Sequence, residues 1–149
     1  MPNNERTLDV LRELIEVCKD GETGYAHAAG IVTDPNLKSY FQKQSLQRAG
    51  FVQELMEQAK SLGEKPDTSG SVAGTLHRLW FEAKADLGLG DQSVLNSVEQ
   101  GEDRAKQAYQ QALKEDLPEA VRGLLQQEAQ SVFAAHDYVR ALRDKEKAA

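Results

Sequence analysis

Two glutamates and two glutamines stand at positions where helical proteins normally carry apolar core residues. Glu22 and Glu102 each interrupt a stripe of apolar residues spaced by three and four. Gln44 and Gln127 interrupt the stripes of the segments that follow. Burying a carboxylate costs on the order of several kcal/mol unless it is paired, protonated or bound to a metal. These positions are therefore where the sequence could support chemistry.

The spacing resembles that of a two-metal carboxylate site that has lost most of its ligands. In ferritin-like four-helix bundles, one helix of each pair supplies a Glu and the other supplies Glu-x-x-His, and all these side chains project inward. Iron and manganese prefer carboxylates and imidazoles, and a neutral amide is a poor ligand for them. The corresponding positions here are Gln44-x-x-Gln47 and Gln127-x-x-Gln130. We therefore expect no bound metal, and we interpret these residues as remains of a metal site: Glu22, Gln44, Gln47, Glu102, Gln127 and Gln130.

One arginine lies on the same stripe as these residues. Arg48 follows Gln44 by one helical turn, and we predict that its guanidinium supplies the positive charge that a metal would otherwise supply. Its expected partner is Glu22 or Glu102. Gln44 and Gln127 are expected to donate hydrogen bonds to the same carboxylates. Two alternatives stay open, namely an unusual iron or manganese site at Glu22 and Glu102, and solvent-filled polar space.

The histidines do not complete a metal site in this interpretation. His27 and His136 lie off the predicted stripes, two residues from the nearest inward position, so we expect both on the surface. His77 lies near Trp80 in a segment between the two helix pairs. We expect it to pack on the bundle, and a place in a partner surface is the alternative.

No motif for catalysis by another route is present. The sequence has no Gly-rich phosphate loop after a strand, no Cys-x-x-Cys pair and no nucleophile elbow. Cys18 and Tyr109 lie on apolar stripes, so we interpret them as core residues. We therefore expect no catalytic residue, no cofactor-binding residue and no enzymatic activity.

Apolar residues with helical spacing predict the elements that position this site. Bundle helices are expected at about residues 7–33, 35–63, 91–116 and 118–143, with a shorter crossover helix at about 71–87. Asp34 and Asp91 are expected to cap helices, with Pro35 in the first turn of the second. The expected inward stripe of the last helix is Val121, Leu124, Gln127, Ala134, Tyr138 and Ala141.

Short turns marked by proline join the helices within each pair, so each pair is expected to form an antiparallel hairpin. The predicted fold is all-α, a ferritin-like four-helix bundle whose two hairpins are joined by a long crossover, in one domain of residues 1–149. The hairpins also resemble each other in sequence. Asp20-Gly21-Glu22 corresponds to Gln100-Gly101-Glu102, and Gln44-Ser45-Leu46-Gln47 to Gln127-Glu128-Ala129-Gln130, which we interpret as an internal repeat.

Composition restricts the classes of partner. The 149 residues carry a formal net charge of −6 and no basic stripe, so we expect no nucleic-acid partner. No apolar run is as long as a membrane span, and the first residues lack the pattern of a signal peptide. We therefore expect a cytoplasmic protein that does not bind membranes.

Three groups of residues carry a resemblance to a known family. They are Gly74-Thr75-Leu76-His77-Arg78-Leu79-Trp80, Glu99-Gln100-Gly101-Glu102 with Tyr109, and Leu117-Pro118. From about Thr7 to Arg143, the chain resembles a bacterial family of uncharacterised ferritin-like four-helix-bundle proteins, a domain of unknown function. The resemblance implies the bundle fold and no particular activity.

These observations favour a non-enzymatic bundle with a metal-free polar core and a structural, stress-related or interaction role. A second copy of the chain is the expected partner, because bundles with exposed apolar faces often pair. The alternative is a divergent iron or manganese carboxylate protein that binds or oxidises metal at Glu22 and Glu102. A nucleoid-associated ferritin relative is disfavoured by the net charge of −6.

Overall fold

The computed structural model describes residues 3–63 and 90–148. They form four helices and no strand: α1 (Asn4–Ile31), α2 (Pro35–Ser61), α4 (Gly90–Ala112) and α5 (Glu119–Ala148). The crossover helix expected at about 71–87, with His77 and Trp80, lies outside the described residues. None of the described helices combines the length and the apolar composition that a membrane span requires.

Side-chain caps determine where the first two helices begin. The Oδ1 atom of Asn3 accepts hydrogen bonds from the backbone N–H groups of Glu5 and Arg6, so α1 begins before the expected residue 7. Asp34 caps α2 as predicted, and Pro35 is the first residue of this helix. The last two helices end at other residues than predicted. Helix α4 ends at residue 112 and not at about 116, and α5 continues to residue 148 and not to about 143.

Asp91 does not cap α4 as predicted, because this helix already begins at Gly90, whose φ is +70°. Its carboxylate instead binds the turn between α1 and α2. It accepts from the backbone N–H of Thr33 at 2.9 Å, from the Thr33 hydroxyl at 3.0 Å and from the backbone N–H of Asp34 at 3.1 Å. These bonds tie the start of the second hairpin to the turn of the first.

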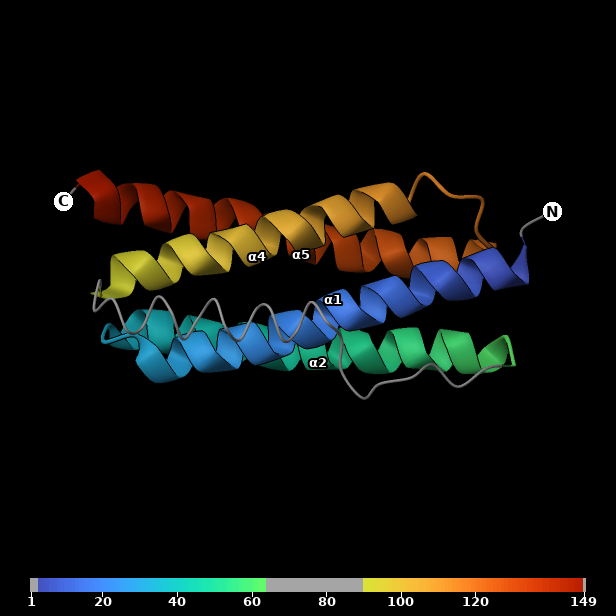
Figure 1. Ribbon diagram of the computed structural model, residues 1–149, viewed down its shortest axis with the longest axis horizontal. Helices are drawn as coiled ribbons and strands as arrows, with labels where there is room; N and C mark the ends of the chain where they lie inside the picture. The colour runs from blue at the N-terminus through green and yellow to red at the C-terminus, as the bar shows by residue number, and fades with distance from the viewer. Residues whose placement is uncertain (1–2, 64–89, 149) are drawn as a thin grey trace.

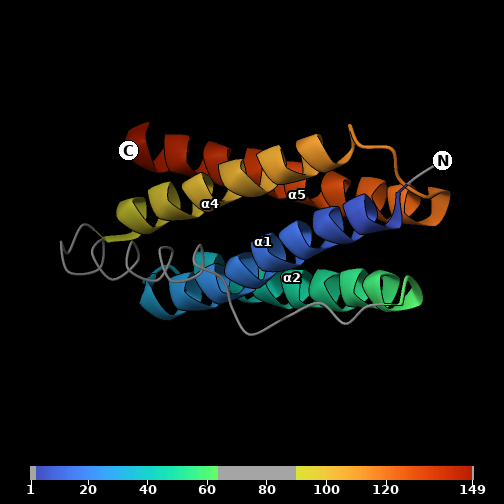
Figure 2. The same cartoon turned by 45° about the vertical axis from the view of Figure 1, so that its right-hand side comes forward.

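The helices form two antiparallel hairpins, α1 with α2 and α4 with α5 (Figure 1). Helix α1 also packs against α4, and the view in Figure 2 shows the same neighbours. Because α2 ends and α4 begins at opposite ends of the bundle, these two helices run in the same direction. This connectivity is that of a ferritin-like bundle, as predicted.

Two apolar clusters fill the bundle, one towards each end, and polar residues lie between them. On α1, Cys18 belongs to one cluster and Tyr25 to the other, with Glu22 between them. On α2, the polar Gln44 and Arg48 separate the clusters, and on α4 Glu102 does so. Helices α1, α2 and α4 therefore contribute to one polar layer across the middle of an otherwise apolar core.

Helix α5 presents a different face to the core from the one predicted. The buried stripe is Val121, Leu125, Glu128, Val132, Ala135 and Val139, whereas Ala134, Tyr138 and Ala141 are exposed. After Val121 the stripe advances by four residues, to Leu125, and the prediction advanced by three, to Leu124. Either step suits a helix. Because Leu124 and Leu125 are adjacent, the sequence does not decide which face of α5 is buried. Packing against the other helices decides it.

We predict that Leu125→Ala lowers the free energy of unfolding by about 2–5 kcal/mol, because it leaves a cavity in the core. Leu124→Ala is the matched control, and we expect it to cost less than half as much, because this neighbouring leucine is only half-buried. Urea denaturation of both variants measures the difference. An equal or larger cost for Leu124→Ala would show that α5 has the other phase.

Candidate functional site in the bundle core

An ion pair crosses the centre of the polar layer. Arg48 of α2 is 1% exposed and Glu102 of α4 is 2% exposed. The Nη2 atom of Arg48 donates to Glu102 Oε2 at 2.8 Å and lies 2.7 Å from Oε1. The partner of Arg48 that the sequence left open between two glutamates is therefore Glu102, and one guanidinium nitrogen engages both of its oxygens.

The sequence next to Glu22 makes room for the arginine. A Cβ on Gly21 would lie 3.1 Å from Nη1 and 3.3 Å from Cγ of Arg48, closer than side-chain atoms normally approach. The Cζ atom of Arg48 also lies 5.6 Å from the centre of the Tyr25 ring, a cation–π distance. Gly21 and the Tyr25 ring, one turn apart on α1, thus both lie against the side chain of Arg48.

The remaining predicted residues of the first hairpin lie near this pair without joining it. Glu22 is half-buried, Gln44 is 8% exposed and Gln47 is half-buried. The Glu22 Oε2 and Gln44 Oε1 atoms are both buried without a hydrogen-bond partner. No hydrogen bond joins Gln44 to Glu22 or Glu102 in the described part of the chain, so that expectation was wrong.

The predicted residues of the last helix are not part of the core. Gln127 and Gln130 are exposed, so neither donates to the core carboxylates. The cause is the phase of α5, since a shift of one residue turns a helix face by about 100°. The same shift places Glu128 inside, at 1% exposure. The sequence contains a signal for this residue, because Glu128 is the one carboxylate in the segment Gln127–Gln130. It directly follows Gln127, the residue that was predicted to face the core.

Glu128 ends a chain of three buried groups. The Tyr109 hydroxyl donates to Glu128 Oε1 at 2.8 Å, and the Cys18 Sγ atom lies 3.2 Å from the same hydroxyl. Tyr109 is buried as predicted, and it also links the carboxylate to the thiol. Cys18 is buried too, and its burial raises the pKa of the thiol to about 12, so it stays protonated at neutral pH.

Burial also raises the pKa of Glu128, to about 8. Glu54 of α2 raises this pKa further, and the hydrogen bond from Tyr109 opposes the shift. Glu128 is therefore largely protonated and uncharged at neutral pH. The charges of Arg48 and Glu102 neutralise each other.

These residues do not fit a two-metal centre. Of the expected ligands, Gln127 and Gln130 point away from the core, and both oxygens of Glu102 face the guanidinium. A divalent cation beside Glu102 would also be repelled by Arg48, strongly so in a buried site of low dielectric. The donor set that a ferritin-like metal site requires is absent from this part of the bundle.

Of the two histidines in the described residues, one lies where it was predicted. His27 is exposed, as expected, but His136 is only 3% exposed, so its predicted surface location was wrong. Its Nε2 atom lies 2.6 Å from Asp103 Oδ1 on α4. This contact again follows from the phase of α5.

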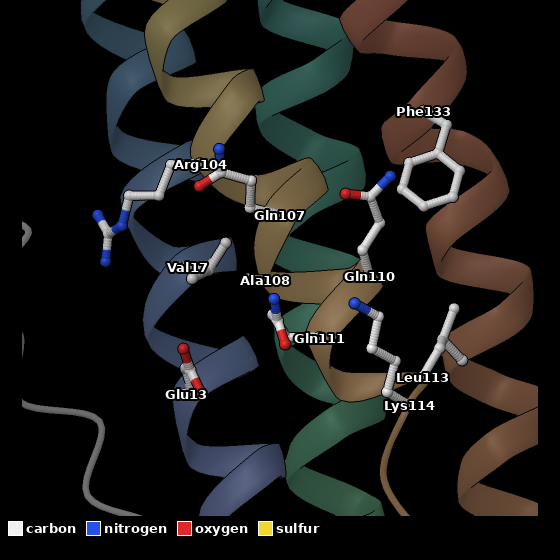
Figure 3. Close-up of a pocket in the computed structure, with 10 residues that line it drawn as sticks. All are labelled: Glu13, Val17, Arg104, Gln107, Ala108, Gln110, Gln111, Leu113, Lys114 and Phe133. Atoms are coloured by element: carbon white, nitrogen blue, oxygen red, sulfur yellow. The ribbon is translucent and has the colours of Figure 1, made fainter.

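An open groove lies away from the polar layer, between α1 and α4 with Phe133 of α5 at its edge (Figure 3). Its lining is Glu13, Val17, Arg104, Gln107, Ala108, Gln110, Gln111, Leu113, Lys114 and Phe133. None of these residues belongs to the Arg48–Glu102 pair or to the Tyr109–Glu128 chain. The groove therefore offers no access to the polar core.

We predict that the stability of the protein falls with rising pH because of Glu128. Its pKa rises from an ordinary 4.5 to about 8 on folding, so between these values the folded state holds a proton that the unfolded state has released. The stabilisation is complete below about pH 4.5 and is lost by about pH 8, at about 1.4 kcal/mol per pH unit. Urea denaturation across this range should show a shallower slope for Glu128→Gln, and equal slopes would contradict the assignment.

We also predict strong coupling between Arg48 and Glu102. Arg48→Met leaves a buried carboxylate without its partner and should cost about 3–5 kcal/mol. The double variant Arg48→Met/Glu102→Leu removes both charges, so it should cost less than the sum of the two single variants. Chemical denaturation of the wild type, the two single variants and the double variant measures this coupling as a double-mutant cycle. A double variant whose cost equals that sum would show that the pair is not coupled.

Comparison with known proteins agrees with this architecture. The family described as Domain of unknown function (DUF2383) matches residues 6–115. No curated protein matches the chain. Among solved structures, a Dps1 mutant from Mycobacterium smegmatis superposes with a TM-score of 0.74 at 17% sequence identity, covering 94% of this chain and 96% of that one. At this identity the likeness extends to the fold alone. The chain therefore belongs to the DUF2383 family, an uncharacterised family with a ferritin-like four-helix-bundle fold.

Proposed function

We propose that this protein is a non-enzymatic bundle with a metal-free polar core and a structural, stress-related or interaction role. The buried ion pair between Arg48 and Glu102 is the observation that carries the proposal. In this proposal the guanidinium supplies the positive charge that a metal would otherwise supply between the helices. With Glu128 protonated and the charges of Arg48 and Glu102 balanced, the centre holds less negative charge to attract a cation.

One observation favours the alternative, a divergent iron or manganese protein. The Glu22 Oε2 and Gln44 Oε1 atoms are buried acceptors without partners, and a cation or water would satisfy both. A metal shared between Glu22 and Glu102 must first displace Arg48, which leaves a buried positive charge unpaired. This cost is the reason we prefer the metal-free core.

Metal analysis and iron oxidation distinguish the two functions. We expect the protein purified without chelator to hold no iron or manganese that depends on Glu22 or Glu102. Ferrous iron added in air should oxidise no faster than in buffer. Glu22→Gln and Glu102→Gln keep the side-chain shapes and serve as controls. Stoichiometric metal or rapid oxidation that both variants abolish would establish the alternative.

We propose a second copy of the chain as the partner. Two large apolar side chains are exposed on the outer faces of α2 and α5, Leu46 at 76% and Tyr138 at 50%. The Tyr138 ring packs on Tyr40 with centroids 4.6 Å apart, so it is held in place at the surface. Exposed apolar side chains suit self-association better than binding to nucleic acid, given the net charge of −6.

Light scattering should therefore give a mass above the 16.5 kDa of one chain. Leu46→Glu replaces the more exposed of these apolar side chains with a charge and should shift the equilibrium towards the monomer. Leu46 is exposed, so this change should leave the helical content intact, which circular dichroism checks. A wild-type protein that is monomeric at all concentrations would contradict the proposal.

A further inference from the structure

Three potential metal ligands meet between α4 and α5, outside the polar core. Glu99 and Asp103 lie one turn apart on α4, and His136 reaches them from α5. One donor atom from each residue lies within 4.8 Å of the other two. None of the three belongs to the Arg48–Glu102 pair, so a site here is independent of the metal-free core proposed above.

The imidazole is held as a metal-binding histidine usually is. Its Nδ1 atom lies 3.1 Å from Asp137 Oδ1, and its Nε2 atom points at Asp103. A carboxylate that accepts from Nδ1–H orients the ring and leaves the Nε2 lone pair for a metal. Because His136 is 3% exposed, packing restricts the ring as well.

The donor set selects a class of ion. One imidazole nitrogen and two carboxylate oxygens suit divalent transition metals such as zinc, manganese or iron. Metal–ligand bonds of about 2.0–2.2 Å place neighbouring donors roughly 3–3.5 Å apart, so the three must draw together on binding. Asp103, whose side chain is 52% exposed, has the freedom to do so. We propose that Glu99, Asp103 and His136 bind one divalent transition-metal ion between α4 and α5.

Arg143 governs the affinity of this site. Its guanidinium forms an ion pair with Glu99, and it also bonds to Asp144 at 2.9 Å. A metal ion must displace this guanidinium to reach the Glu99 carboxylate. Arg143 therefore competes with the ion, and its removal should strengthen binding. An ion-pair network without metal affinity predicts no such gain.

Cobalt(II) is a suitable probe because its visible absorption reports on coordination. We expect the chelator-treated full-length protein to bind one equivalent, with new absorption bands. Asp103→Asn should weaken binding roughly tenfold or more, since it removes a charged ligand. Arg143→Gln should tighten it severalfold, and Glu57→Gln, on the exposed surface of α2, should leave it unchanged. Zinc should also shift the imidazole resonances of His136 in nuclear magnetic resonance spectra.

Three results would overturn the proposal: no cobalt absorption, equal affinity in Asp103→Asn and wild type, or no change in the His136 resonances with zinc. The assay also separates this site from the core. Metal binding that is lost in Glu22→Gln but kept in Asp103→Asn would place the ion in the core and contradict both proposals. Binding lost in Asp103→Asn alone supports the site between α4 and α5 and leaves the metal-free core intact.

Discussion

The guanidinium of Arg48 crosses the middle of the bundle from α2 to reach Glu102 on α4, and much of the interior is arranged around this contact. Gly21 lacks a side chain where the arginine passes, and the Tyr25 ring lies against its charged end. Apolar clusters close the core on both sides of the polar layer. Water is thereby kept from the pair, so each charge depends on the other to offset the cost of its desolvation.

Such a pair contributes more to register than to net stability. A buried ion pair is often no more stable than apolar residues of similar size, because desolvation offsets the Coulomb attraction. Sliding α2 by one turn, about 5.4 Å, would separate the charges and leave both buried without a partner. Helices α2 and α4 run in the same direction in the two hairpins, and this pair links them directly. The contact therefore favours one alignment of the two hairpins.

Helix α4 faces two polar environments with different chemistry. Glu102 and Tyr109 point into the core, where Arg48 and a protonated Glu128 balance charge without a cation. Glu99 and Asp103 face α5, where the His136 imidazole and the partly exposed Arg143 meet them. A metal-free core and a metal site between α4 and α5 are compatible in one bundle, because Arg48 is buried with its carboxylate whereas Arg143 is partly exposed and can be displaced.

The sequence was sufficient for the fold, the two hairpins and the stripes of α1, α2 and α4, because regular spacing of apolar residues and capping side chains act locally. It also singled out Arg48 and Glu102, since charges within an apolar stripe must find partners. It was not sufficient for α5. Leu124 and Leu125 allow two choices of the buried face of α5. The wrong choice predicted Gln127 in the core in place of Glu128, and it predicted His136 on the surface. Only the packing of α5 against the other helices distinguishes these phases, because the difference lies in which neighbours each face meets and not in the local preference of the chain for a helix.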